Sequence, residues 1–341
     1  MKDHTVFDGS GEMCSIMRAY DWKSSPLGPV DDWPQSLKTA VQILLSSRFS
    51  MWMAWGPELV FFYNDAYRKA TLGEKHPWAL GRAAREVWSE IWTEIGPRIQ
   101  TVLDTGVATW DEGLLLFLER SGFSEETYHT FSYSPLKDDN GKVAGMLCVV
   151  AEETNRVLGE RQLASLKRFA SELGTAITEE EVRQIVVANC RANQQDLPFT
   201  LTYLVDENEQ QAQLFCVTGF DGPDPAAPST IDLSSSSIWP ISAVLEANDS
   251  LVIDVKEVSH RLPRGLWELP ANTVLLVPIA RRGQKKAAGI LIAGLSPYRI
   301  LNSDYEGYIK LMAGQLAASL ANANAYEQDR KRTDAGAAGQ G

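Results

Sequence analysis

The sequence predicts an α+β protein of two domains, each an antiparallel sheet flanked by helices, joined by a helical linker. The chain has 341 residues, and at roughly 150 residues per domain this length suggests two domains. Hydrophobic residues make up 44% and charged residues 22%, so each half can bury a core. Strand-length patterns lie on both sides of a helical pattern, and the domain boundary is expected near 152–160.

Charge and cysteine content exclude several classes of protein. The net charge is −12 and the pI is about 4.9, which argues against a nucleic-acid partner because such proteins carry a basic face. The four cysteines lie far apart without a C-x-x-C pair, so neither a disulfide framework nor a structural zinc site is expected. The sequence shows no signal region and no membrane-length apolar run, and we expect a cytoplasmic protein without membrane insertion.

The first domain is expected over 36–152, after an extended lead-in over 1–35 that is rich in Gly, Ser, Pro and Asp. Gly56-Pro57 predicts a hairpin between the first two strands, and Asn140-Gly141 predicts another because this pair tolerates positive φ. The final strands form a meander. The expected elements are a helix at 36–46, strands at 51–55 and 58–63, helical patterns at 65–72, 77–92 and 93–103, and strands at 110–120, 126–135 and 143–151.

A helical connector is expected over 153–177. Its apolar residues repeat at alternating spacings of three and four, which gives a seam of about two heptads. This seam is short for a stand-alone coiled coil, so we expect the helix to pack on a partner helix. The seam residues are Leu163, Leu166, Ala170, Leu173 and Ile177.

The second domain is expected over 178–326. Capping boxes at Thr178–Glu181 and Ser303–Glu306 predict the starts of its first and last helices. The Ala/Gly-rich end of the chain predicts a disordered tail over 327–341. Between the two helices we expect strands at 199–205 and 213–220, a short helix near Ser237, and strands at 250–255, 273–280 and 287–295.

The first half resembles PAS domains. The run Phe62–Tyr67 is similar to the step from the second PAS strand into a helix, and Leu80-Gly81-Arg82 and Val143–Met146 follow in the order of the family. Arg48–Trp52 resembles one subgroup at the front of large bacterial hybrid histidine kinases and related phosphatase-output regulators.

The second half resembles GAF domains through Val277-Pro278-Ile279, Gly289-Ile290-Leu291 and the helical segment 311–323. The joint resemblance implies a PAS-GAF sensory module of a bacterial sensor histidine kinase or related phosphatase-output regulator. Such a module binds a small ligand or a partner and relays a signal through its end helices. A homodimer formed by those helices and a downstream kinase or phosphatase output domain are further implications. An interaction and dimerisation scaffold with filled cavities, or a haem- or bilin-bearing sensor, are the alternatives.

Aromatic residues concentrate in the first third, which holds eight of the ten tryptophans. They either line a ligand cavity or fill a core, and the sequence leaves both interpretations open. Near Ser237, the expected helix start offers either an anion site or a plain N-cap. The candidate ligand-binding residues are Tyr63, Asn64, Tyr67, Trp88, Trp92, His129, Phe131 and Tyr133 in the first half and Trp239 and Trp267 in the second.

The sequence gives no support for catalysis or for a resident cofactor. It contains no P-loop, nucleophile elbow or His-Glu-x-x-His motif, so we do not expect an enzyme. His129 and His76 are the histidines that a haem would use, and Cys14 is the cysteine that a bilin would use. Adjacent acids on strands, such as Glu125-Glu126 and Glu152-Glu153, point to opposite faces, and we interpret them as solvated strand ends.

Overall fold

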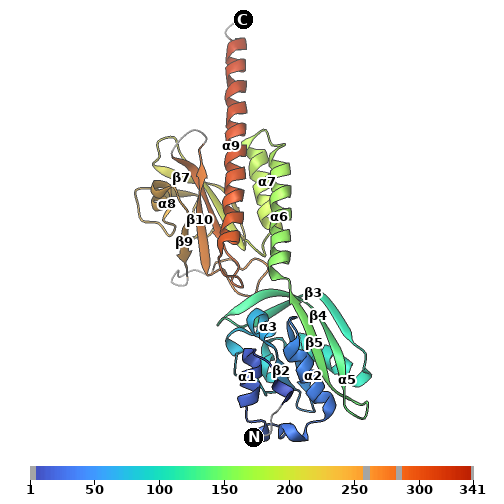
Figure 1. Cartoon of the computed structure of the whole chain (residues 1–341). Coiled ribbons are helices and arrows are strands. Elements are labelled where there is room, and N and C mark those ends of the chain that lie inside the picture. Colours follow the sequence, from blue (N-terminus) through green and yellow to red (C-terminus); the bar gives the residue numbers. More distant parts are fainter. Residues whose placement is uncertain (1–4, 256–261, 282–285, 339–341) are drawn as a thin grey trace. The chain divides into compact units, whose positions relative to one another are not determined.

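The computed structural model describes residues 5–255, 262–281 and 286–338. The chain divides into two compact units, Met1–Leu158 and Gly159–Gly341. Each unit contains one antiparallel sheet with helices (Figure 1), which confirms the predicted two-domain α+β architecture. Helix α6 (Thr154–Leu173) begins in the first unit and ends in the second. None of the described helices combines the length and the apolar character needed to cross a membrane.

The first unit is built on a five-stranded antiparallel sheet. Its strands are β1 (Met51–Trp55), β2 (Val60–Tyr63), β3 (Thr109–Glu119), β4 (Ser124–Lys137) and β5 (Val143–Glu152). Their order in the sheet is β2-β1-β5-β4-β3. The β4–β5 hairpin turns at Gly141, whose φ of +79° favours glycine.

Helices and short turns flank this sheet. They include α2 (Gln35–Ser46), α3 (Asp65–Tyr67), the π-helical turn η4 (Arg68–Leu72), α4 (Ala84–Val87) and α5 (Trp92–Thr105). The prediction of a helix over 77–92 is wrong for most of this range, because between 77 and 91 only α4 is α-helical. Pro77 lacks a backbone donor and Gly81 has a φ of +76°, so the chain forms turns before α4.

The N-terminal segment is not the extended lead-in that we expected. It forms helix α1 (Glu12–Ala19) and short 3-10 turns, and its apolar side chains belong to the core of the first unit. Trp22 is 4% exposed, and its ring stacks on Phe62 of β2 with centroids 5.0 Å apart. Trp33 meets the same Phe62 ring edge-on at 5.8 Å. The segment is therefore part of the domain, because it covers an aromatic face of the β1–β2 hairpin that water would otherwise contact.

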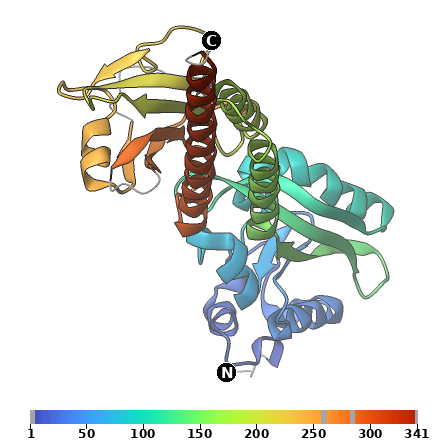
Figure 2. The same cartoon turned by 90° about the horizontal axis from the view of Figure 1, so that it is seen from above.

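The second unit is built on a six-stranded antiparallel sheet. Its strands are β6 (Phe199–Val205), β7 (Gln211–Thr218), β8 (Thr230–Asp232), β9 (Leu251–Asp254), β10 (Thr273–Ala280) and β11 (Ala287–Gly294). Their order is β8-β7-β6-β11-β10-β9. Helices α6, α7 (Glu179–Ala192) and α9 (Ser303–Ala338) pack on one face, and α8 (Ile241–Ala247) packs on the other. Figures 1 and 2 both show α9 running beside α6 and α7.

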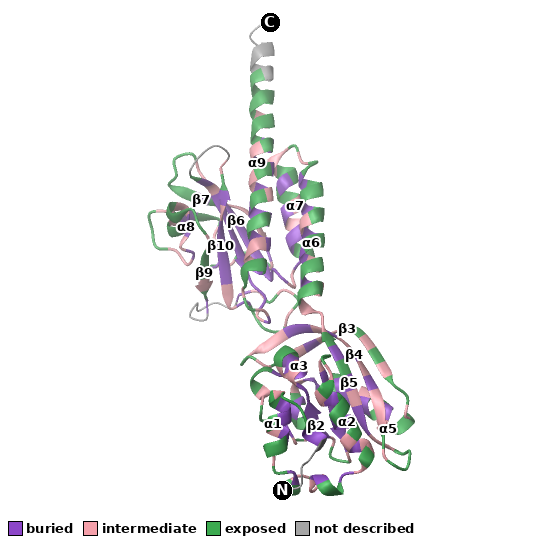
Figure 3. Ribbon diagram, viewed as in Figure 1, coloured by how far each residue is buried: buried purple, intermediate pink, exposed green. Residues whose placement is uncertain are grey.

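Helix α6 packs on the core of the second unit with only part of its predicted seam, namely Leu173, which is 5% exposed, and the partly buried Leu166. Its buried side carries Ser165 and Phe169, whereas Leu163 is 52% exposed and Ile177, just beyond the helix, is 49% exposed. The Ser165 hydroxyl lies 3.0 Å from the Tyr308 hydroxyl of α9. Apolar and polar side chains thus share the buried face of α6, and part of the predicted seam lies at the surface (Figure 3).

Helix boundaries in the second unit agree with the sequence at one capping box and differ elsewhere. The Thr178–Glu181 box is confirmed. Helix α8 begins at Ile241 after Pro240, rather than near Ser237. The cap of α9 is Asn302, whose Oδ1 accepts from the Tyr305 N–H at 2.9 Å, so the proposed Ser303 box is wrong. The helix continues to Ala338, so the disordered tail is also wrong over 327–338, and 339–341 lie outside the described residues.

Candidate ligand-binding site

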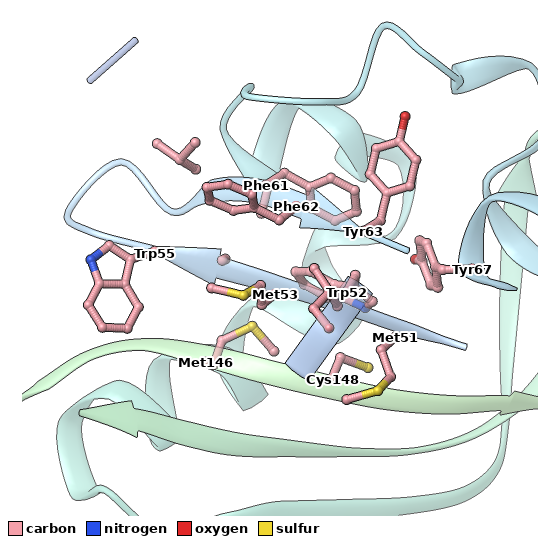
Figure 4. Packing of buried hydrophobic residues seen from close by; sticks show 14 of the residues in the cluster. Met51, Trp52, Met53, Trp55, Phe61, Phe62, Tyr63, Tyr67, Met146 and Cys148 are labelled. Atoms are coloured by element: carbon pink, nitrogen blue, oxygen red, sulfur yellow. The ribbon is translucent and has the colours of Figure 1, made fainter. Parts of the chain in front are cut away.

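The interior of the first unit holds a cavity of about 30 Å³ between the sheet and the helical segments after β2. That volume is about the share of one water molecule in the liquid. Its walls are made of aromatic and aliphatic side chains (Figure 4 labels three of its residues, Trp52, Tyr67 and Cys148). Trp52 meets Tyr133 edge-on at 5.8 Å, and Tyr67 meets Trp88 edge-on at 6.3 Å. These rings and the aliphatic side chains beside them leave only a small cavity between the elements.

The titratable wall groups are held in their neutral forms. Burial raises the pKa of Tyr67, Tyr133 and Cys148 well above the usual values of these groups. A phenol or thiol in this environment keeps its proton because water cannot solvate the anion. The cavity thus presents an uncharged surface and suits an uncharged ligand.

Thr71 supplies an unused polar group to the cavity. It is 5% exposed, and its Oγ1 has no hydrogen-bond partner in the part of the chain that the structure describes. A buried hydroxyl left unpaired costs about 1–3 kcal/mol. Thr71 lies in the π-helical turn η4, a type of distortion that is frequent at functional sites. A ligand in the cavity could satisfy this hydroxyl.

His129 is the second polar group of the wall. It is 2% exposed, and its Nε2 lies 3.0 Å from the Thr127 hydroxyl. Burial, helped by the positive charge of Arg120 and opposed by Glu152, lowers the pKa of His129 to about 4. The imidazole is therefore neutral near pH 7 and offers a hydrogen bond rather than a charge.

Arg120 connects the cavity wall to the start of α6. Its Nη1 donates to the Ala70 carbonyl of η4 at 2.8 Å and to Glu152 at 2.6 Å, and its Nη2 donates to the other Glu152 oxygen at 2.8 Å. Thr154, the first residue of α6, donates its hydroxyl to Glu152 at 2.9 Å. Burial alone would raise the pKa of Glu152, but the hydrogen bonds and charge of Arg120 outweigh it and hold this pKa below its usual value. We call Arg120, Glu152, Thr154 and the Ala70 carbonyl the Arg120 junction.

The strand-end interpretation of the paired acids is wrong for three of them. Glu125, whose side chain is 15% exposed, accepts a hydrogen bond from Arg120 Nε at 3.1 Å. Glu152 is bidentate to Arg120 rather than solvated. Glu126 is 2% exposed, and its Oε1 accepts from the Tyr128 hydroxyl at 2.9 Å.

The structure brings five of the predicted ligand residues to the cavity wall. They are Tyr67, Trp88, His129, Phe131 and Tyr133. Asn64 instead caps α3, with its Oδ1 accepting from the Tyr67 N–H at 2.9 Å. Trp92 opens α5 and packs against the core outside the cavity.

Tyr63 belongs to a polar cluster on another side of the first unit. Its hydroxyl lies 2.8 Å from His76 Nδ1, and His76 Nε2 lies 3.3 Å from a Glu12 oxygen. Arg68 pairs with the second Glu12 oxygen at 2.9 Å. These contacts fasten α1 to the segment after β2.

The two predicted residues of the second unit have structural partners. Trp239 is 1% exposed, and its indole N–H donates to the Ala226 carbonyl at 2.7 Å. Trp267 donates to the Gln195 carbonyl at 2.8 Å and meets Tyr298 edge-on. Neither tryptophan lines the cavity of about 310 Å³ beside α8 in this unit.

Sequence reasoning missed Thr71, Arg120 and the role of Glu152. Nothing in the local pattern marks Arg120 or Glu152, because their partners lie up to 50 residues away along the chain. Only the aromatic residues gave a signal, through their number and their strand alternation.

The family whose model matches the chain is described as the PAS fold, and the match spans residues 49–158. The cavity and the Arg120 junction lie within the matched residues. No curated protein matches the chain.

Solved structures similar to the chain include GAF domains of two bacterial phosphotransferases and a phytochrome photosensory core module. The GAF domain of the Acinetobacter phosphoenolpyruvate-protein phosphotransferase is 20% identical with a TM-score of 0.37, covering 48% of this chain and 95% of that one. The corresponding Coxiella burnetii domain is 18% identical with a TM-score of 0.38, covering 49% of this chain and 96% of that one. The Stigmatella aurantiaca phytochrome photosensory core module is 12% identical with a TM-score of 0.40, covering 86% of this chain and 62% of that one.

Proposed function

We propose that the chain is the sensory input module of a signal-transduction protein, with a GAF-type second unit after the PAS unit. A small uncharged ligand binds in the PAS cavity, and the Arg120 junction carries its effect to α6. The observation that carries this proposal is the junction itself. One guanidinium holds both η4, which bears the unpaired Thr71 hydroxyl, and Glu152, which holds the first residue of α6.

The energetic requirement on such a ligand is modest. A ligand shifts a two-state equilibrium only by its differential affinity for the two states, and a few kcal/mol are sufficient. Because the cavity of about 30 Å³ admits one water, a larger ligand requires wall side chains or η4 to move. Movement of η4 displaces the Ala70 carbonyl, which Arg120 binds.

We further propose that the module acts as a homodimer through its end helices and controls a histidine-kinase or phosphatase output domain in the cytoplasm. Exposed apolar side chains on two parallel helices support the dimer. Leu163 of α6 is 52% exposed and Leu311 of α9 is 59% exposed. A second copy that packs against both helices would remove these side chains from water.

A scaffold with a filled cavity is the second candidate, favoured by the small volume of that cavity. Hydrogen–deuterium exchange distinguishes the sensor from the scaffold. Small uncharged compounds such as phenol and indole are first tested by thermal shift, and exchange over 152–166 is then measured with a compound that binds. The sensor predicts altered exchange at the start of α6 in the wild type and in the exposed-site control Arg85→Gln, but not in Arg120→Gln. If exchange at the start of α6 changes equally in Arg120→Gln, the junction does not carry the signal. If none of the compounds binds, the scaffold is favoured.

A further inference from the structure

The second unit contains a cavity of about 310 Å³, at the lower end of the range for small-molecule sites. It lies beside α8, where β6 ends and β11 begins. Trp239 belongs to the packed core of this unit and does not line the cavity. Its aliphatic lining consists of Val205, Leu233, Leu245 and Ala287.

The hydroxyls of the cavity can only accept hydrogen bonds from a ligand. Ser242 donates its proton to the Leu233 carbonyl at 2.6 Å, and Ser234 donates to an Asp232 carboxylate oxygen at 2.7 Å. Because each proton is already used, each oxygen offers a ligand its lone pairs alone. This part of the lining therefore favours a donor-rich group.

The charged lining residues are of both signs. Glu246 of α8 forms no ion pair within the described ranges of the chain. Lys286 pairs with Glu209, but its side chain is 69% exposed, and such a pair is worth little in water. Its ammonium can thus exchange this partner for an anionic ligand group at small cost.

We propose that this cavity binds a small aliphatic amino acid in its zwitterionic form. The ligand ammonium binds Glu246 and the oxygens of Ser234 and Ser242, and the ligand carboxylate binds Lys286. The aliphatic side chain lies against Leu245 and the other apolar lining residues. This site is independent of the ligand proposed for the PAS cavity, so either proposal can fail without the other.

Isothermal titration of the full chain with three molecules of similar shape tests the charge requirement. L-leucine carries both charges, 4-methylpentanoate carries only the carboxylate, and 3-methylbutylamine carries only the ammonium. We expect leucine to bind at least about tenfold more tightly than either analogue, because each lost charged contact costs more than about 1.4 kcal/mol. No heat with leucine up to about 10 mM, or an affinity for either analogue equal to that for leucine, overturns the proposal.

Variants then locate the site. Glu246→Gln and Lys286→Gln should each weaken leucine binding by about tenfold, and Leu245→Trp should abolish it by filling the cavity. Glu172→Gln and Lys167→Gln on α6 are the matched controls and should bind as the wild type does. Circular dichroism checks the fold of Leu245→Trp, and the two exposed charge variants provide the test if it does not fold. Unchanged binding in both charge variants overturns the proposal.

Discussion

Replacing Arg120 by Gln should destabilise the PAS unit by about 2–3 kcal/mol. The guanidinium makes hydrogen bonds to Glu125, Glu152 and the Ala70 carbonyl, and the Arg120 side chain is 15% exposed. Removing one partner of a fully buried ion pair costs about 3–5 kcal/mol because the other charge stays unpaired. Glu152 retains 20% exposure, so water offsets part of that loss. For a unit of this size the loss corresponds to a Tm lower by about 4–12 °C.

Tryptophan fluorescence during urea unfolding measures this change, because eight of the ten tryptophans lie in the first 110 residues. A double-mutant cycle with Glu152→Gln isolates the pair. We expect a coupling energy above about 1 kcal/mol, since the pair is bidentate and mostly buried. Arg85→Gln, at an exposed site, is the control and should stay within about 0.5 kcal/mol of the wild type. A loss below about 0.5 kcal/mol in Arg120→Gln, or a coupling energy near zero, refutes the junction as a structural link.

Three further predictions concern other parts of the chain. The folded pKa of His129 is about 4 and its unfolded pKa about 6.5, so the unfolded state binds more protons between these values. Stability should therefore fall by up to about 3 kcal/mol as pH drops from 6.5 to 4, with a shallower fall in His129→Gln, as urea titrations at several pH values will show. Trp22→Ala should lower the free energy of unfolding by about 3–5 kcal/mol in the same assay. The control Trp110→Ala, at a site that is 67% exposed, should lower it by less than about 0.5 kcal/mol. Equal losses in the two variants contradict the packing of the N-terminal segment. Leu163→Asp combined with Leu311→Asp should convert a dimer to a monomer in analytical ultracentrifugation, and a monomeric wild type contradicts the dimer.

Elements whose cause is local were predictable from the sequence. Strand alternation placed β4 and β6 within a few residues of their bounds, because side chains on a strand point to alternate faces wherever the strand lies. The predicted capping box at Thr178–Glu181 is confirmed, because both of its hydrogen bonds form within one turn of the helix. The Ser303 box failed because the preceding Asn302 caps α9 instead.

The sequence by itself determined the fold class, the two sheets and the aromatic character of the first interior. Only the tertiary structure decided which face of α6 is buried, since its Arg161 and Ser165 pair with Asp196 and Tyr308, far along the chain. It also decided that the N-terminal segment joins the core, through the stacking of Trp22 on Phe62. The cavity and the Arg120 junction were likewise decided only by the tertiary structure. Their residues meet only after the sheet has formed, because a long-range contact depends on the path of the whole chain and leaves no periodic signal in the sequence.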